Sequence, residues 1–268
     1  IERKKGGTSS EKKLSYRKEY MMKLSNSMKK DKNILVVMPV KDEHKKTLEQ
    51  HSQGNKFIYS SYDNVTQEMV QEANVIIGNV DPFYLQEAKN LEWLNSAGAD
   101  PYVKKSVLPE DVILTNATGA YGPSVAEHML AVLFSLQKKL HLYRDNQNQC
   151  EWQDEGGVMS LCGGTLLIVG LGDIGLYFAR LMKNFDYHII GIKRRPGQVP
   201  QDIDELHTMN DLDKLLPEAD VVLSVLPDSK ATRNIFNKDR FEKMKNTSIL
   251  LNAGRGSAVI TEDLWEAL

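Results

Sequence analysis

The sequence predicts an α/β protein of two lobes, each built around a parallel β-sheet. Two series of short, β-rich apolar runs alternate with polar stretches of helical pattern, which is the order typical of β-α-β units. A glycine-rich segment follows the first run of the second series, and a longer segment of helical periodicity separates the two series. With 268 residues, the chain is long enough for two domains with separate cores.

The first lobe is predicted from the first series of apolar runs. These runs are rich in Ile, Val, Leu, Phe and Tyr, and β-branched and aromatic side chains of this kind pack well on a pleated sheet. The predicted strands lie within residues 33–40, 57–60, 74–78, 92–96 and 111–116. We assign residues 32–120 to this lobe.

The second lobe is predicted from the later series, within residues 165–170, 187–193, 219–227 and 247–254. A helix should begin at Gly122 and Pro123, because proline fits the first turn of a helix. Apolar residues then recur at helical spacing at Val125, Met129, Val132, Leu133 and Leu136. We expect one long helix over residues 123–147 that bridges the lobes, and we assign residues 121–268 to the second lobe.

Charge and composition argue against several classes of protein. Residues 1–31 carry ten Lys or Arg against four Asp or Glu and few apolar residues, so we expect a disordered basic lead. The formal net charge of −2 gives no reason to expect nucleic acid or an acidic membrane as a partner. No membrane span is expected, because the longest apolar runs are far shorter than the roughly 20 residues that cross a bilayer. Cys150 and Cys162 are spaced like neither a zinc site nor a redox pair, which favours reduced thiols in a cytoplasmic protein without a metal.

The motif GLGDIG, residues 170–175, matches GxGxxG in the context that a dinucleotide site requires. It follows the predicted buried strand TLLIV and precedes the helical pattern LYFARLMKNF. Gly170 would permit the tight turn, Gly172 would let the backbone approach a pyrophosphate, and Gly175 would let the helix pack on the strand. The pyrophosphate would then lie at the positive end of the helix. We therefore expect Rossmann-like or flavodoxin-like lobes; the alternative is a strand-to-helix turn that binds nothing.

The end of the next strand favours a phosphorylated dinucleotide. Roughly 20 residues after such glycines, an NAD site usually places Asp or Glu on the ribose 2′-hydroxyl. Here the strand ends in Lys193, Arg194 and Arg195. Because a guanidinium grips a phosphate through two hydrogen bonds whereas a carboxylate repels it, we expect NADP(H) in preference to NAD(H). A solvated basic turn is the alternative, and Asp173 is expected to be an anion at the helix N-terminus rather than a ribose ligand.

Arg255 stands between two glycines directly after the last apolar run. Hydride addition to a carbonyl leaves negative charge on oxygen, and a cation at that oxygen accelerates the reaction. An arginine can also hold a carboxylate through two hydrogen bonds, which would orient a 2-oxo acid for attack. We therefore predict a catalytic role for Arg255, with a surface arginine at the start of the next helix as the alternative.

Four stretches of the sequence resemble signatures of the D-isomer-specific 2-hydroxyacid dehydrogenases, which include glyoxylate and hydroxypyruvate reductases and phosphoglycerate dehydrogenase. The resemblance extends from residue 33 to residue 268, and its most specific parts are VGLGDIG and the segment from ADVVLSVLPDSKATRNIF to LLNAGRGSAVITEDL. LNSAGAD, residues 94–100, and NATGAYGPSVAEH, residues 116–128, match the substrate-side signatures. The resemblance implies a reductase that turns a small 2-oxo acid into a D-2-hydroxy acid.

The resemblance also implies roles for individual residues. Residues 32–120 would be the substrate domain, with the backbone N–H groups of Ala97 and Gly98 on the substrate carboxylate. Arg255 would orient the substrate, and the second lobe would form a homodimer. His128 lies on the apolar-periodic bridging helix, so the residues themselves favour a packed or domain-interface position for it, and Tyr121 is a candidate to reach the cleft. The remaining cofactor contacts would be Asp173 and Ile174 at the pyrophosphate, Arg194 at the 2′-phosphate, Leu226, Pro227 and Thr232 along the cleft, and Ala253 near the nicotinamide.

The sequence departs from the family after Arg255. Family members continue with a glutamate and a histidine that acts as the general acid, and no histidine follows Arg255 here. We therefore interpret the cofactor lobe as incomplete at its C-terminus and expect the 268-residue chain to turn over poorly; NADPH-dependent glyoxylate reduction at ordinary rates would contradict this. The alternative functions are a non-catalytic dinucleotide sensor on the same fold and an inactive gene fragment.

Overall fold

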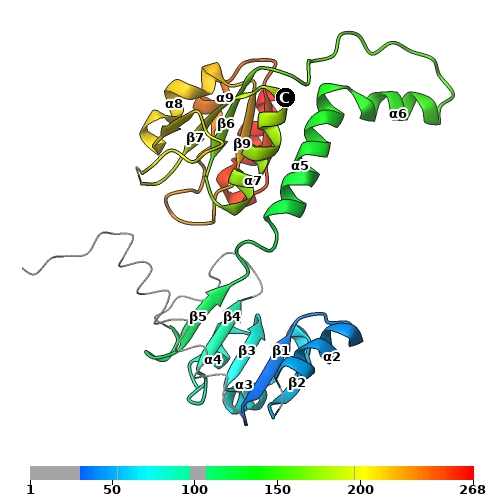
Figure 1. Ribbon diagram of the computed structural model, residues 1–268. Coiled ribbons are helices and arrows are strands. Elements are labelled where there is room, and N and C mark those ends of the chain that lie inside the picture. Colours follow the sequence, from blue (N-terminus) through cyan, green and yellow to red (C-terminus); the bar gives the residue numbers. More distant parts are fainter. Residues whose placement is uncertain (1–30, 53, 97–106, 196) are drawn as a thin grey trace, which may run out of the picture. The chain divides into compact units, whose positions relative to one another are not determined.

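In the computed structural model, which describes residues 31–52, 54–96, 107–195 and 197–268, the chain divides into two compact units between Ala117 and Thr118 (Figure 1). Within the described residues each unit contains one sheet of five strands, and every strand pairing is parallel. The predicted two-lobed α/β class is thereby confirmed. The predicted basic lead lies outside the described residues, apart from Asp31.

The sheet of the first unit has the strand order β2-β1-β3-β4-β5. This is the order typical of flavodoxin-like sheets. Each of the five apolar runs in the first series forms one strand: β1 (Asn33–Val37), β2 (Lys56–Ser60), β3 (Val75–Gly78), β4 (Trp93–Ser96) and β5 (Ile113–Asn116).

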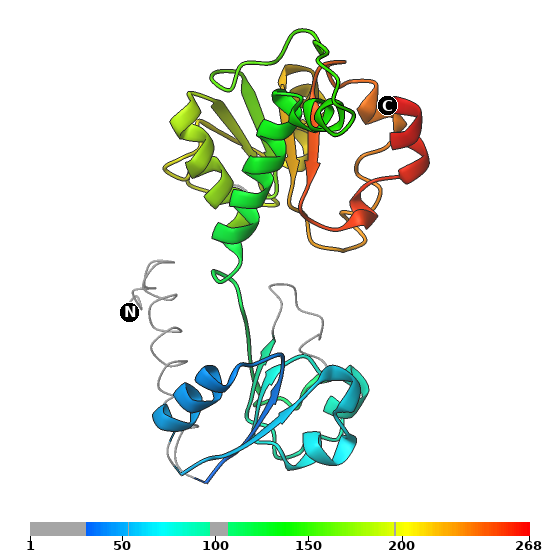
Figure 2. The same ribbon diagram turned by 90° about the vertical axis from the view of Figure 1, so that its right-hand side faces the viewer.

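The helices of the first unit lie on both faces of this sheet (Figure 2). On one face, Val70 and Leu85 pack with Leu35, Ile76 and Leu94 in the main core. On the other face, Lys45 lies over the ring of Tyr59, whose hydroxyl donates to Glu49. The helices are α2 (Asp42–His51), α3 (Gln67–Glu72) and α4 (Pro82–Leu85), with a 3₁₀ turn at Tyr62–Asn64.

The sheet of the second unit has the strand order β10-β9-β6-β7-β8. Counted along the chain within this unit, the order is 3-2-1-4-5 from the β8 edge, which is the order typical of a Rossmann sheet. The strands are β6 (Thr165–Val169), β7 (His188–Ile192), β8 (Glu205–His207), β9 (Val221–Ser224) and β10 (Ile249–Asn252). The short β8 strand was not among the predicted runs, because its sequence, ELH, carries little apolar signal.

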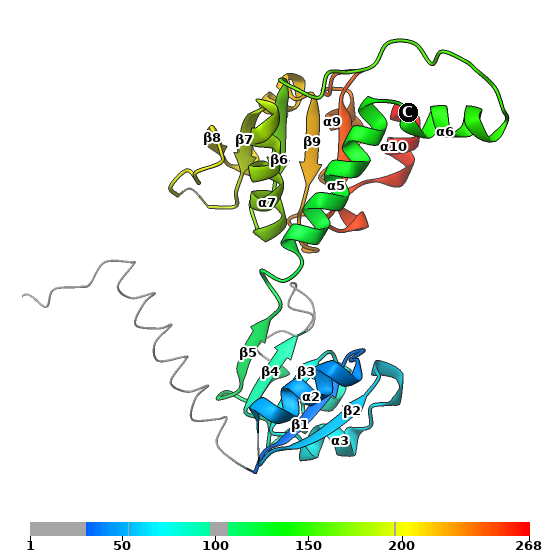
Figure 3. The same cartoon turned by 45° about the vertical axis from the view of Figure 1, so that its right-hand side comes forward.

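Apolar side chains cover both faces of the second sheet. Helices α5 (Gly122–Gln137) and α7 (Asp173–Met182) lie along one face (Figure 3), where Leu133 and Phe178 pack with Leu166 and Ile168. Leu212 and Phe236 pack on the other face against Leu167 and Val222. The remaining helices are α6 (Leu140–Asn148), α8 (Leu212–Leu215), α9 (Lys238–Phe241) and α10 (Thr261–Ala267), with 3₁₀ turns at Lys183–Phe185, Met209–Asp211, Leu216–Glu218 and Gly256–Ala258.

The prediction of one continuous helix over residues 123–147 is wrong, because the chain breaks between α5 and α6. Lys139 has a φ of 52°, a left-handed conformation that ends regular α-helix geometry. The side chains of Lys138 and Lys139 donate to the carbonyl oxygens of Met159 and Glu155, so both lysines are turned toward the segment that follows α6. The apolar face that packs on the sheet belongs to α5, whereas α6 contains no buried residue.

Two further expectations concern the environment of the chain. Within the described residues, no helix combines the length and the apolar character that a membrane crossing requires. Cys150 and Cys162 are both exposed and form no disulfide.

Candidate functional site

The carboxyl ends of the strands in the second unit meet at one edge of the sheet. Parallel pairing brings the segments after β6, β7, β9 and β10 to this edge. The strand β6 lies between β7 and β9, so the chain reverses its direction of winding at β6. Ligands of open α/β sheets bind in the crevice at such a reversal.

The turn after β6 depends on glycine at positions 170 and 175. Gly170 has a φ of +110°, which side chains rarely tolerate, and a Cβ there would lie 2.6 Å from the carbonyl oxygen of Val225. A Cβ at Gly175 would lie 2.5 Å from the carbonyl oxygen of Gly170 and 3.1 Å from Ile168. The two glycines therefore let the turn pack against β9 and let α7 pack against β6.

Gly172 lies in a different environment from the other two glycines of the motif. No described atom lies within 4 Å of a Cβ built on Gly172, and the residue is exposed. It is the N-cap of α7, and among the described side chains none makes a capping hydrogen bond there. The first N–H groups of α7 have no partner within the helix, so this end of α7 offers an anion both hydrogen-bond donors and space.

The basic turn follows β7 at the same edge. The backbone N–H of Lys193 donates to the carbonyl oxygen of His207 at 3.0 Å, which extends the pairing of β7 with β8. Lys193 is half-buried, and Arg194 and Arg195 are exposed. In the described part of the chain, no carboxylate forms an ion pair with any of these three cations. Their charge is therefore available to an anionic ligand.

The segment after β9 forms a turn that its own hydrogen bonds stabilise. The hydroxyl of Thr232 donates to the carbonyl oxygen of Pro227 and accepts from the backbone N–H of Ser229 at 2.9 Å. Leu226 is buried, whereas Pro227 is exposed. Pro227 and the hydrogen-bonded Thr232 therefore lie beside the glycine loop, because Gly170 of that loop packs against the backbone of Val225.

Arg255 lies on the segment after β10, which packs against the end of β9. Ala253 continues the strand pairing through a hydrogen bond from its N–H to the carbonyl oxygen of Ser224. A Cβ at Gly254 would lie 2.6 Å from the carbonyl oxygen of Leu226, so the two backbones touch. The Asn252 side chain accepts from the N–H of Gly254 and donates to the carbonyl oxygen of Arg255. The exposed Arg255 side chain therefore extends from a segment that its backbone contacts hold in place.

Asp228 connects the segments after β9 and β10. Both of its carboxylate oxygens accept from Arg233, each at 2.9 Å, and one also accepts from the hydroxyl of Ser257 at 2.9 Å. These hydrogen bonds, with the nearby charge of Arg255, lower the pKa of Asp228 to about 2. Asp228, Arg233 and Ser257 were not among the predicted site residues, although the aspartate five positions before the arginine in PDSKATR is a detectable signal of a local ion pair.

Comparison with known proteins identifies the family. Residues 130–268, more than half of the chain, match the family model of the D-isomer specific 2-hydroxyacid dehydrogenases, in its NAD binding domain. The chain belongs to this family.

Relatives within the dehydrogenase family include enzymes of different names. A glyoxylate/hydroxypyruvate reductase B of Yersinia pestis is 29% identical over 234 residues, which is 82% of this chain and 71% of the relative. A D-lactate dehydrogenase of Streptococcus agalactiae is 31% identical over 175 residues, 65% of this chain but only 52% of the relative. The chain thus spans about half the length of that lactate dehydrogenase.

A solved structure of the same family agrees with the fold of this chain. The D-isomer specific 2-hydroxyacid dehydrogenase family protein of Aeromonas salmonicida superposes with a TM-score of 0.77 at 31% identity, and the match covers 89% of this chain and 77% of that protein. A D-lactate dehydrogenase of Aquifex aeolicus, solved in complex with NAD and lactic acid, has a TM-score of 0.69 at 23% identity. The second of these comparisons supports the fold alone.

The structure brings most of the predicted cofactor residues to one edge and leaves others elsewhere. Ala97 and Gly98, predicted to bind the substrate carboxylate, lie outside the described residues. Tyr121 is exposed directly before α5. His128 is exposed on α5 within the second unit, and the domain-interface position expected for it stays a prediction.

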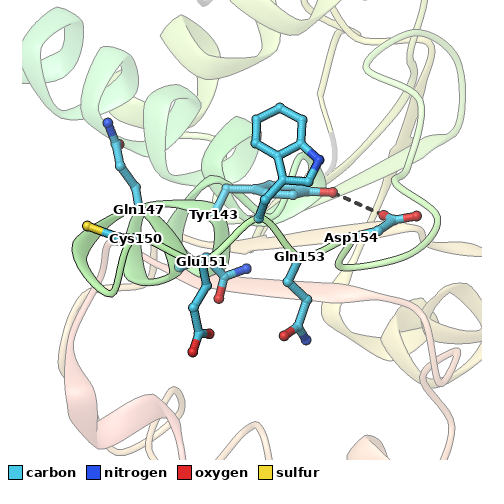
Figure 4. A pocket seen from close by; sticks show the side chains of 8 residues that line it. Tyr143, Gln147, Cys150, Glu151, Gln153 and Asp154 are labelled. Carbon is cyan, nitrogen blue, oxygen red and sulfur yellow. Dashed lines mark hydrogen bonds between the residues drawn. The ribbon is translucent and has the colours of Figure 1, made fainter.

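The second unit also has a pocket at the end of α6 that none of the predicted site residues lines. Figure 4 shows Tyr143 and Gln147 from α6 beside Cys150, Gln153 and Asp154 from the segment that follows it, with the Tyr143 hydroxyl donating to Asp154 at 3.4 Å. The complete lining comprises Tyr143, Asn146, Gln147, Cys150, Glu151, Trp152, Gln153 and Asp154. None of these residues lies on the segments that follow β6, β7, β9 or β10, so the pocket is not part of the carboxyl edge.

Proposed function

We propose that residues 121–268 bind a nicotinamide dinucleotide along the carboxyl edge of the second sheet, with NADP(H) preferred to NAD(H). The observation that carries this proposal is the open space at Gly172 in front of the uncapped N-terminus of α7. A pyrophosphate needs both space and unpaired N–H donors, so the residues present fit the group. The match to an NAD binding domain supports the same ligand class.

The remaining contacts are proposed from their places at this edge. The backbone N–H groups of Asp173 and Ile174 would meet the pyrophosphate, and Arg194, flanked by Lys193 and Arg195, would grip the 2′-phosphate. Leu226, Pro227 and Thr232 would line the cofactor cleft, with Ala253 near the nicotinamide.

We further propose that the protein reduces a small 2-oxo acid, such as glyoxylate or hydroxypyruvate, to the D-2-hydroxy acid. The bound dinucleotide supplies the hydride. Arg255 would hold the substrate carboxylate and stabilise the charge that develops on the carbonyl oxygen. Residues 32–120 would supply the substrate domain, with Ala97 and Gly98 at the carboxylate. The name of the Yersinia pestis relative supports the choice of substrate.

Replacing Arg194 by alanine tests the cofactor proposal. We expect the Kd of NADPH to rise about tenfold and that of NADH to change less than about twofold, because only NADPH carries the 2′-phosphate that the guanidinium would bind. The measurement is a fluorescence titration of the 268-residue chain with each dinucleotide.

Arg180→Ala is the matched control, since Arg180 is an exposed cation in the last turn of α7. It should leave both affinities unchanged. Equal losses for NADPH and NADH in Arg194→Ala would remove the reason to prefer the phosphorylated form. Failure of the wild-type chain to bind either dinucleotide would refute the proposal as a whole.

We also propose that the second unit forms a homodimer through the surface around α6. Large apolar side chains are exposed there: Leu136, Leu140, Tyr143, Trp152 and Val158. Trp152, in the segment after α6, is fully exposed at 104%. Exposed aromatic anchors of this size are typical of interfaces, because their burial removes a large apolar area from water.

Trp152→Glu is expected to shift the homodimer to monomer, with a rise in the dimer Kd of at least about thirtyfold, because a charge replaces an aromatic anchor. Sedimentation velocity over a range of concentrations measures the change. Trp265→Glu on α10 is the matched control, since Trp265 is also exposed, at 81%, but lies outside this surface. A wild-type chain that sediments as a monomer at all concentrations, or equal effects of the two variants, would exclude this interface.

A further inference from the structure

The carboxylate of Asp173 is held by the residues that precede α5. Asp173 is the first residue of α7, and its Oδ2 accepts a hydrogen bond from the backbone N–H of Gly119 at 3.1 Å. Gly119 has a φ of +97°, a conformation that favours glycine. Both residues belong to the second unit. The side chain in the middle of the glycine motif is therefore turned toward residues 119–122.

Gly122 makes room for that carboxylate. Gly122 is buried at the first position of α5, and a Cβ built on it would lie 2.7 Å from Cγ and 3.0 Å from Oδ1 of Asp173, and closer still to Oδ2. Any larger residue at position 122 would displace the carboxylate. Displacement should cost little folding energy, because the end of an aspartate side chain is free to rotate.

The position of this charge matters for an anionic ligand. A carboxylate in the first turn of a helix interacts favourably with the same N–H groups that a pyrophosphate would use. If it were free to fold back over the N-terminus of α7, it would both occupy these donors and repel the ligand.

We propose that Gly119 and Gly122 are positioning residues that hold the Asp173 carboxylate away from the dinucleotide pyrophosphate. The proposal rests on the proposed function, in which the N-terminus of α7 binds that pyrophosphate. Asp173 then donates its backbone N–H to the ligand, while its carboxylate remains beside Gly119 and Gly122.

A double-variant experiment tests this role through charge rather than shape. Gly122→Ala should weaken NADPH binding at least about threefold, a charge effect of the size found at helix ends, and the loss should shrink at high salt. Adding Asp173→Asn to Gly122→Ala should restore the affinity of the Asp173→Asn single variant, because the displaced side chain is then neutral. Gly157→Ala is the control, since no described atom lies within 4 Å of a Cβ there.

A second pair of variants leaves Gly122 untouched. The side chains of Asp173→Glu and Asp173→Gln are both too long for the place beside Gly119, but only glutamate is charged, so Asp173→Glu should bind NADPH at least about threefold more weakly than Asp173→Gln. An unaffected Gly122→Ala, a double variant as weak as Gly122→Ala, or equal losses in the Glu and Gln variants would overturn the inference. Each of these results requires that the wild type binds NADPH, so they are distinct from a failure of the proposed function, in which the wild type does not bind.

Discussion

Gly170→Ala is expected to lower the free energy of unfolding by about 2–6 kcal/mol, since backbone strain and overpacking each cost about 1–3 kcal/mol. The native φ of +110° is unfavourable for alanine, and the new Cβ would lie 2.6 Å from the carbonyl oxygen of Val225. Neither partner in this contact is a flexible side chain, so relief requires the β6 turn to separate from the end of β9. Urea unfolding followed by circular dichroism measures the loss.

Gly157→Ala is the control for Gly170→Ala, because position 157 has open space and does not have a positive φ. It should change the free energy of unfolding by less than about 0.5 kcal/mol. An equally small change in Gly170→Ala would show that the turn can move without cost, and the steric explanation of this glycine would have to be abandoned.

Gly172→Val is expected to weaken dinucleotide binding by about ten- to hundredfold while the protein stays folded. The valine side chain would fill the space in front of α7 and displace a phosphate from its N–H donors, and a hydrogen bond to a charged group contributes about 1.5–3 kcal/mol. Valine fits the extended backbone at this position, with φ −94° and ψ −160°. NADPH titration gives the affinity. The free energy of unfolding, measured by urea denaturation, should change by less than about 1 kcal/mol.

The contrast between positions 170 and 172 makes this second prediction specific. Gly170→Ala should act mainly on stability, and Gly172→Val should act mainly on binding, although the two glycines are two residues apart. Gly157→Val serves as the control for the larger side chain. A Gly172→Val variant that binds NADPH as the wild type does would place the pyrophosphate elsewhere.

The strands and the glycine loop of this chain could be predicted because their signals are local. Continuous apolar runs such as Leu166–Val169 are needed for strands buried on both faces, and that requirement is written into consecutive residues. The order of strands and helices then restricts the topology to a few parallel arrangements. The chemistry of hydride transfer and of phosphate binding extended this reasoning to Arg255 and the basic turn, and the family signatures agreed with it.

The expectation of one continuous helix over residues 123–147, which failed, and the residues that were missed depend on partners distant in sequence. Lys138 and Lys139 continue a helical pattern, but their side chains bind carbonyl oxygens of Met159 and Glu155, and the helix breaks there. Asp228 reaches Ser257, 29 residues further along the chain, and no local pattern indicates that contact.

The sequence by itself determined the α/β class, the two series of strands, the glycine turn and the cations that follow β7 and β10, since each of these follows from the properties of neighbouring residues. The tertiary structure decided which glycines allow close packing of the backbone and which one leaves room for a ligand. Gly170, Gly175 and Gly254 touch other backbone segments, while Gly172 faces open space. It also decided that the Asp173 carboxylate meets Gly119 and Gly122. The reason is physical, because steric contact and hydrogen bonding act over a few ångströms in space regardless of separation along the chain.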